Sequence, residues 1–197
     1  MSASALSEPY LSVKEYLTSE ALSPVKREYL GGIVYAMAGA SEAHNHIAFS
    51  LGRMLGNQLR GRRCDGFGSD MQVRIHRRQP EGTYFYYPDA MVACHPTDTG
   101  HGWREQPSAL FEIISESTRQ IDEREKRSAY LQISSLDAYV RIEQDRPEAV
   151  VEFRTVEGWR RERIIGLDGI IRLPTLEIEL PLAELYERVV FPTDETL

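Results

Sequence analysis

The 197-residue sequence contains only two cysteines, Cys64 and Cys94. Two thiols in a chain of this length are typical of a reducing compartment, so we expect no disulfide framework. No apolar run approaches the roughly 18 residues that a membrane-spanning helix needs. The first nine residues lack a basic leader followed by an apolar segment, so no signal peptide is expected. These absences predict a cytoplasmic protein without membrane association.

Positive charge is also scarce. The 23 Lys and Arg residues stand against 30 Asp and Glu, which gives a formal net charge of -7. This balance argues against a protein that coats nucleic acid through bulk charge, although local basic patches can coexist with an acidic total. The sequence has no P-loop, dinucleotide-binding fingerprint or Gly-x-Ser-x-Gly elbow. Its length predicts one domain, 1–197, with residues 1–9 flexible and a core at about 10–190.

Hydrophobic periodicity predicts an α/β (α+β) domain with a mixed sheet. Ser12 and Glu15 form a capping box that predicts a helix over about 12–21. Two β-prone segments joined by Gly31-Gly32 predict a hairpin. An apolar stripe at three- and four-residue spacing predicts a helix over 44–59. Further strands are expected at 71–76, 84–94, 109–114, 137–143, 148–156 and 159–165, helices at 117–133 and 182–189, and turns or loops at 77–82, 96–106 and 166–174.

Two apolar segments each carry a carboxylate where a strand core would normally exclude one. Asp89 lies within 84–94, and Glu112 is flanked by apolar residues within 109–114. An ionised carboxylate in apolar surroundings costs several kcal/mol unless it is paired, hydrogen-bonded or bound to a metal. Asp89 follows Pro88, so an ordinary turn is the alternative interpretation for that residue. Two such carboxylates in neighbouring segments indicate a candidate site.

A third unusual group follows on the helix expected over 117–133. Three- and four-residue spacing places five residues on one face: Asp122, Lys126, Ala129, Tyr130 and Ile133. The apolar end of this stripe should pack on the sheet, so Asp122 and Lys126 should continue the buried face toward the end of the Glu112 strand. The alternative interpretation is an i,i+4 ion pair at a helix start, which contributes only a few tenths of a kcal/mol.

Several motifs occur in a fixed order along the chain. They are Tyr87-Pro88-Asp89, the segment FEIISEST at 111–118, the pattern Asp122-x-x-x-Lys126-x-x-x-Tyr130, and supporting pieces at 28–37, Ser41, His44 and 136–140. The set resembles the PD-(D/E)XK nuclease superfamily, and in particular the Uma-type restriction endonucleases, a bacterial family formerly known as a domain of unknown function. The resemblance extends over about residues 10–185. It implies a restriction-endonuclease-like fold, with a mixed central sheet flanked by helices and an N-terminal β-hairpin.

The resemblance also implies a metal-dependent endonuclease that hydrolyses phosphodiester bonds in DNA through a metal-activated water. Asp89 and Glu112 would hold Mg²⁺ or Mn²⁺, with the backbone carbonyl of Ile113 as a further ligand. The superfamily pattern places a lysine two residues after the second acid, where this chain has Ile114. Lys126 on the next helix would supply the missing amine. The implied catalytic set, with the family's accessory acid included, is Asp89, Glu112, Lys126 and Glu28.

The alternative function is a catalytically inactive nuclease-fold module that binds nucleic acid or a protein partner. The displaced lysine and the negative net charge both favour keeping it. DNA is the expected substrate, with RNA left open, and a homodimer is suggested by analogy because cutting both strands needs two sites. The basic clusters at 60–63, 74–78 and 160–163 are candidate phosphate contacts, with solvated surface an equal alternative.

The remaining histidines and cysteines form weaker patterns. Cys94, His95 and His101 suggest a zinc site, but no fourth ligand has suitable spacing. His44 matches a family position near the implied site, although capping or packing at a helix start explains it more simply. Neither pattern therefore adds to the predicted site.

Overall fold

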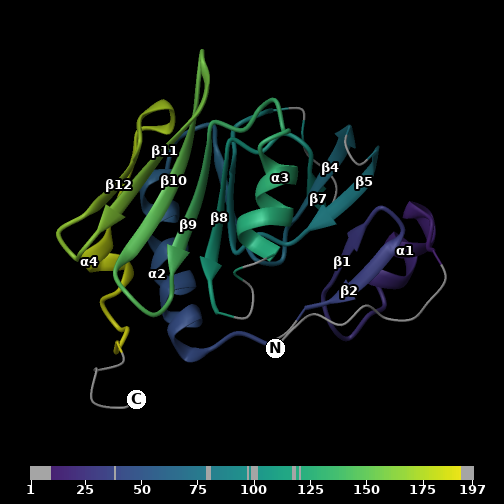
Figure 1. Ribbon diagram of the computed structural model, residues 1–197, viewed down its shortest axis with the longest axis horizontal. Helices are drawn as coiled ribbons and strands as arrows, with labels where there is room; N and C mark the ends of the chain where they lie inside the picture. The colour runs from purple at the N-terminus through teal and green to yellow at the C-terminus, as the bar shows by residue number, and fades with distance from the viewer. Residues whose placement is uncertain are drawn as a thin grey trace.

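A computed structural model gives the fold and describes residues 10–191, except for 38, 79–80, 97, 99–101, 117–118 and 120; it leaves out the side chains at 81, 122 and 123. Two mixed β-sheets form the body of the molecule (Figure 1). A six-stranded sheet lies on the left of the view, with the helix α2 (Glu42–Gln58) behind it. A five-stranded sheet lies on the right, next to α1 (Val13–Glu20). The expected α/β class with flanking helices is confirmed, but the strands are divided between two principal sheets.

The six-stranded sheet has the order β11-β10-β9-β8-β6-β3. Its strands are β3 (Asp65–Gly68), β6 (Ala90–Ala93), β8 (Ala109–Ile114), β9 (Ala138–Glu143), β10 (Glu148–Thr155) and β11 (Gly158–Ile165). Strands β8 and β9 are parallel, whereas the other neighbours are antiparallel. Every residue of β8 is buried, as expected for a strand that is covered on both faces. Glu112 therefore lies in the interior of the molecule.

The five-stranded sheet has the order β2-β1-β5-β4-β7. Its strands are β1 (Arg27–Leu30), β2 (Ile33–Ala36), β4 (Gln72–Arg78), β5 (Glu81–Tyr86) and β7 (Trp103–Arg104). The predicted hairpin is β1–β2, and its turn residues Gly31 and Gly32 have φ of 59° and 112°, a region that side chains rarely adopt. One face of this sheet packs on α1, and the other packs on the six-stranded sheet through Tyr84 and Tyr86.

The helices cover the outer faces and fill the space between the sheets. α2 packs on one face of the six-stranded sheet, together with the short helix α4 (Leu182–Leu185). On the other face, η1 (Ile121–Lys126), which is a π-helix, continues into α3 (Arg127–Tyr130) between the two sheets. In the part of the chain that the structure describes, no helix is both long and apolar enough to cross a membrane.

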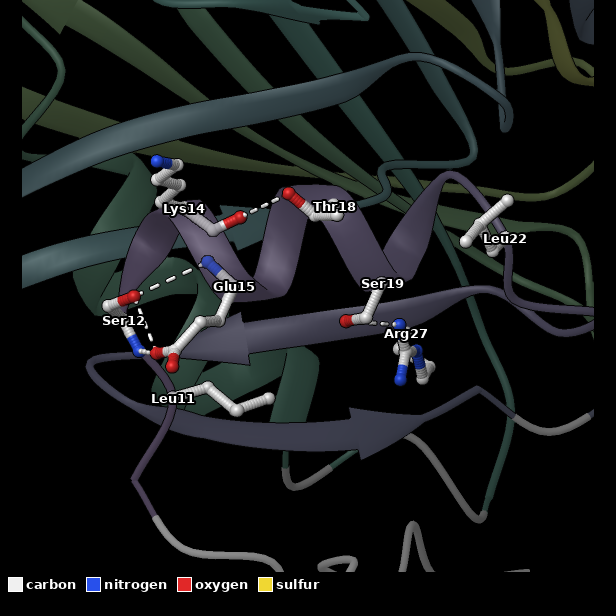
Figure 2. A pocket seen from close by; sticks show the side chains of 8 residues that line it. All are labelled: Leu11, Ser12, Lys14, Glu15, Thr18, Ser19, Leu22 and Arg27. Atoms are coloured by element: carbon white, nitrogen blue, oxygen red, sulfur yellow. Dashed lines mark hydrogen bonds between the residues drawn. The ribbon is translucent and has the colours of Figure 1, made fainter.

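The capping box at α1 is confirmed, and it borders a hollow of about 760 Å³ beside that helix (Figure 2). The Ser12 hydroxyl accepts from the Glu15 backbone N–H at 3.3 Å, and the Glu15 carboxylate accepts from the Ser12 N–H at 2.8 Å. The Ser12 hydroxyl also donates to the Glu15 carboxylate at 2.6 Å, and this hydrogen bond, followed by the one from the Ser12 N–H, lowers the pKa of Glu15. Glu15 is the one acidic side chain among the eight residues that line the hollow in Figure 2. The hollow therefore lacks the paired acids of the predicted site.

The prediction of a single strand over 84–94 is wrong. The structure divides it into β5 and β6, which belong to different sheets. Pro88 lies at the break, where its missing N–H and fixed φ prevent a continuous ladder. The backbone N–H of Tyr87 leaves the ladder and donates to the Glu28 carboxylate at 3.1 Å. The break places Asp89 at the point where the chain passes between the sheets.

Several other boundaries differ from the expectation. β4 continues through Arg78 and β5 begins at Glu81, so the turn expected over 77–82 is much shorter. The helix expected over 117–133 ends at Tyr130, and Ser117 and Gln120 of its expected cap lie outside the described residues. The terminal helix ends at Leu185 instead of 189. Four strands were not predicted: β3, β7, β12 (Ile170–Leu173) and its partner β13 (Ile178–Pro181). The 3₁₀ helix η2 (Pro174–Leu176) lies between the last two.

The expectation of no disulfide is wrong, because Cys64 and Cys94 are bonded to each other. Antiparallel pairing of β3 and β6 sets Asp65 opposite Ala93, so the two cysteines face each other one position further along. Their sequence separation of 30 residues gave no indication of this pairing. The bond also removes Cys94 as a free thiolate from the imagined zinc site, whose His101 lies outside the described residues.

We expect loss of this disulfide to destabilise the protein substantially. Closing a loop of about 30 residues in the unfolded chain corresponds to about 3–4 kcal/mol in the chain-entropy description. The Cys64→Ser, Cys94→Ser double variant should lose this free energy of unfolding, measured by urea titration of the oxidised protein. Treatment of the wild type with a dithiol reductant should give the same loss, and an unchanged midpoint after verified reduction would contradict the prediction.

Paired charges lie beneath the outer strands of the six-stranded sheet. Glu148 on β10 accepts two hydrogen bonds from Arg163 on β11, at 2.6 and 2.8 Å, and one from Arg146 at 3.0 Å. Only 7% of its side chain is exposed. The Arg163 guanidinium, followed by that of Arg146, lowers the pKa of Glu148 from 4.5 to about 2. Glu148 therefore remains ionised at neutral pH.

This depressed pKa predicts a pH-dependent contribution to stability. A carboxyl whose pKa is lower when folded contributes fully above its unfolded value of 4.5, and the contribution disappears as the pH falls to about 2. The Glu148→Gln variant should therefore be less stable than the wild type at about pH 7 and should approach it at about pH 2.5. Urea unfolding at both pH values measures the difference, and a gap that stays constant with pH would contradict the assignment.

Candidate active site

Glu28, Glu112 and Lys126 meet between the two sheets. The Lys126 ammonium lies 3.2 Å from each carboxylate oxygen of Glu112 and 3.2 Å from Oε1 of Glu28. The side chain of Lys126 is only 6% exposed, that of Glu112 4% and that of Glu28 11%. Each comes from a different element: Glu28 from β1, Glu112 from β8 and Lys126 from the last residue of η1. A lysine this deeply buried requires paired carboxylates, which the two strands supply.

Tyr130 completes the surroundings of Glu112. Tyr130 lies one turn beyond Lys126 and is fully buried. Its hydroxyl donates to Glu112 Oε1 at 2.8 Å. Burial, reinforced by the negative charge of Glu112, raises the pKa of Tyr130 well above its usual range. The phenol therefore remains a hydrogen-bond donor, and it fixes the orientation of the Glu112 carboxylate.

We expect Tyr130→Phe to lower the free energy of unfolding by about 1.5–3 kcal/mol, the range for hydrogen bonds to charged groups. The ring remains, so the substitution removes only the donor to Glu112 and leaves one more carboxylate lone pair unsatisfied. Urea unfolding measures the change. Tyr35→Phe is the matched control, because Tyr35 lies on β2 and is only partly buried. Equal effects of the two substitutions would contradict a specific role for the Tyr130 hydroxyl.

Asp89 is fixed against the same strand. Its Oδ2 accepts from the backbone N–H of Ile113 at 2.7 Å, and its Oδ1 lies 2.9 Å from Nε2 of His44. Antiparallel pairing of β6 with β8 sets Ala90 opposite Phe111, so Asp89 lies beside Glu112 just before β6 begins. The structure therefore brings Asp89 to the peptide that follows Glu112, at the end of β8 where Lys126 also lies.

The predicted site carries more negative than positive charge. With all groups ionised, the carboxylates of Glu28, Asp89 and Glu112 give three negative charges against the single positive charge of Lys126. In the described part of the chain, no three His, Cys, Asp or Glu side chains converge closely enough to hold an ion by themselves. Mg²⁺ is usually bound by one or two carboxylates with water and substrate oxygens completing the shell. The donor set therefore fits a hard divalent cation held by two carboxylates, and not an all-protein metal cage.

Sequence reasoning found the acids and the lysine but missed part of their support. His44 is the N3 residue of α2, whose N-cap is Ser41, and the capping explanation did not indicate its contact with Asp89. The π-helical geometry of η1 was also unexpected, so the i,i+4 pairing of Asp122 with Lys126 does not follow from α-helical spacing. The side chain of Asp122 lies outside the described residues.

Two of the predicted basic clusters lie away from this site or are already engaged. Arg62 donates to the backbone of Leu176 at 2.7 Å and lines a hollow with Cys94 near the start of β8, at the opposite end of that strand from Asp89. Arg77 is buried and paired with Glu125, and Arg74 pairs with Glu105 at 3.0 Å. The third cluster lies on β11, on the same sheet as Glu112.

Comparison with known proteins settles the family. Residues 13–183 match the model of the family described as "Uma2: Putative restriction endonuclease". The chain belongs to this family. The match includes all four predicted site residues, and it agrees with the resemblance carried by the ordered motifs around Asp89, Glu112 and Lys126.

Relatives of this Uma2 protein include two from Synechocystis sp., both described as uncharacterized. The protein sll1609 is 33% identical over 137 residues, which cover 68% of this chain and 75% of the relative. The protein slr1290 is 32% identical over 135 residues, covering 68% and 69%. A crystal structure from Anabaena variabilis, described as a putative nuclease belonging to DUF820, has a TM-score of 0.68 at 14% identity and covers 90% of this chain and 98% of its own. That likeness establishes the fold.

Proposed function

We propose that this Uma2 protein is a metal-dependent endonuclease that hydrolyses phosphodiester bonds in DNA. The observation that carries the proposal is the burial of Glu112 against Lys126, with Asp89 bonded to the next peptide of the same strand. Two carboxylates and one ammonium at the end of one strand supply ligands for a cation and a positive charge for phosphate. Family membership supports nuclease chemistry, and the excess of negative charge at the site supports the need for a cation.

Each residue of the site has a distinct proposed role. Asp89 and Glu112 would hold Mg²⁺ or Mn²⁺, with the carbonyl of Ile113 as a further candidate ligand. Bound there, the cation would lower the pKa of a water and offset charge on the scissile phosphate. Lys126 contacts both oxygens of Glu112 and orients that carboxylate, and its ammonium can contact a phosphate oxygen as a point charge. Glu28 orients Lys126 and holds the Tyr87 peptide, which fixes the approach to Asp89.

The test is divalent-ion-dependent cleavage of end-labelled single- and double-stranded DNA. Wild type should cut with Mg²⁺ or Mn²⁺ and should stop when a chelator is added, whereas Asp89→Asn, Glu112→Gln and Lys126→Ala should each lose activity. The variants purified in parallel also control for contaminating nucleases. Cleavage that persists in all three variants, or that needs no divalent ion, would overturn the assignment.

A non-cutting module is the second candidate because Ile114 occupies the position of the superfamily lysine. Ile114 is 1% exposed and cannot supply an ammonium, so catalysis depends on Lys126 alone. Folded wild type that binds DNA and a divalent ion but leaves every labelled strand intact would favour this second function.

A further inference from the structure

A row of paired residues connects the candidate site to the edge of the six-stranded sheet. Glu112 on β8 pairs with Arg141 on β9, Arg141 with Val150 on β10, and Val150 with Arg163 on β11. Residues that are directly paired on neighbouring strands point to the same face of a sheet. The row therefore runs across one continuous face, from the buried acid of the site to an arginine on the outermost strand.

Five arginines with exposed or partly exposed side chains surround this row, and we call them the arginine band: Arg119, Arg127, Arg146, Arg161 and Arg163. Arg127 directly follows Lys126, and Arg119 lies just beyond β8, where its backbone N–H donates to Ser115. Arg161 pairs with Glu152 across β10 and β11, so it lies on the same face as Arg163. The band therefore begins beside the candidate site and ends at the sheet edge.

Buried carboxylates pair with the arginines of the band and fix their positions. Glu143 is shared by Arg119 and Arg146, Glu148 by Arg146 and Arg163, and Glu152 by Arg127 and the buried Arg141. The side chains of Glu143 and Glu148 are each 7% exposed and that of Glu152 is 2% exposed. Among the described residues, the exposed carboxylate of Asp145 also pairs with the band, 3.0 Å from Arg146. The side of this network that faces solvent is therefore mostly guanidinium.

Arg161 is the residue that distinguishes a binding role of the arginine band from a purely structural role. A structural role would require each arginine to neutralise a buried acid, as Arg163 does for Glu148. Arg161 is exposed and has no ion-pair partner within the described part of the chain, although it stands in the same row as Glu152. An unpaired arginine on a strand already rich in arginine adds local repulsion, which a bound polyanion would relieve.

We propose that the arginine band binds the phosphate backbone of DNA held at the candidate site. This inference rests on the proposed function. Guanidinium groups suit phosphate because they donate in a planar fork, and fixing them beforehand lowers the entropic cost of binding. From β8 to β11 there are three strand spacings, or about 14 Å. DNA advances about 3.4 Å per nucleotide along one strand, so the band spans about four nucleotides from the scissile phosphate.

The test measures binding separately from cleavage, using the full chain and a fluorescein-labelled DNA duplex with Ca²⁺ replacing Mg²⁺. Arg161→Gln and Arg163→Gln should each weaken binding by about 3- to 10-fold and should lower the slope of log affinity against log salt by about 1. Arg161→Gln leaves every described ion pair intact, so it isolates the binding effect from folding. Arg63→Gln is the matched control, because Arg63 is exposed beside Cys64 at the other end of the sheet.

The proposal would be overturned if both band variants kept the wild-type affinity and salt slope. It would also be overturned if Arg63→Gln lost as much affinity as the band variants, or if the wild type did not bind DNA. Cleavage with Mg²⁺ at saturating protein is a separate measurement. Unchanged binding in the band variants of a wild type that cuts would overturn the band alone. Weakened binding in these variants of a wild type that never cuts would leave the band in place and overturn the proposed nuclease activity.

Discussion

Replacement of Glu112 by glutamine should reduce divalent-ion-dependent DNA cleavage by about 10²- to 10³-fold, because the lost charge stabilisation of about 3–4 kcal/mol corresponds to that factor in rate. Glutamine retains the shape of the side chain and can still accept from Tyr130, so the fold should survive. What disappears is the charge of one of the two carboxylates proposed to hold the cation, and with it the partner that holds Lys126 on this side of the site. Initial rates on a labelled duplex at saturating Mg²⁺ measure the effect.

The matched control for this substitution is Glu162→Gln. Glu162 is exposed on β11 and pairs with Val151, so it lies on the opposite face of the same sheet from Glu112. It undergoes the same change of one carboxylate to an amide and should keep the wild-type rate. Circular dichroism of both variants separates lost chemistry from lost structure. A Glu112→Gln variant that is folded and cuts within about threefold of wild type would remove Glu112 from the proposed catalytic set.

Replacement of Lys126 by methionine should have the largest effect on stability, about 3–5 kcal/mol, because it leaves buried carboxylates without their cation. Methionine retains most of the side-chain volume, so the loss reflects charge more than packing. Glu28 and Glu112 would then face each other across the gap between the sheets, at 11% and 4% exposure. Urea unfolding at neutral pH measures the loss, and cleavage should cease in the same variant.

A double-mutant cycle tests the electrostatic origin of that loss. The combined Glu28→Gln, Lys126→Met variant lacks one of the two unpaired acids, so it should be more stable than the sum of the single effects predicts by about 1–3 kcal/mol. Additive losses would mean that Lys126 stabilises the protein through packing and not through its charge. The same cycle with Glu162→Gln should be additive, because Glu162 is exposed on the opposite face of the sheet.

Short-range sequence patterns predicted the elements that depend on interactions within a few residues. The Ser12–Glu15 capping box, the Gly31-Gly32 turn and the apolar stripe of α2 each act within a few residues, and the structure bears out all three. Glu112 was conspicuous because a carboxylate within an all-apolar strand must have a partner. Helical spacing already directed Lys126 toward the end of the Glu112 strand, and the family pattern, in which Lys126 replaces the amine missing at Ile114, pointed to the same residue.

Features that depend on long-range pairing could not be obtained in this way. The residues of 84–94 are apolar on both sides of Pro88, so periodicity gives no sign that the chain changes sheets there. Cys64 and Cys94 meet only because β3, itself absent from the prediction, pairs with β6. The π-helical turn before Lys126 has no sequence signal that distinguishes it from α-helix. The contact between His44 and Asp89 required the position of α2 relative to β6.

The passage of the chain from one sheet to the other at Pro88 has a consequence for biosynthesis. The site draws on β1 for Glu28, on the crossing for Asp89, on β8 for Glu112 and on η1 for Lys126. β8 in turn is paired on one side by β9, which ends at Glu143. A ribosome-bound chain therefore contains no assembled site until β9 has been made, long after Glu28 and Asp89. The proposed DNA-cutting activity would therefore be acquired only after β9 has joined β8, and products truncated before Glu143 would lack it.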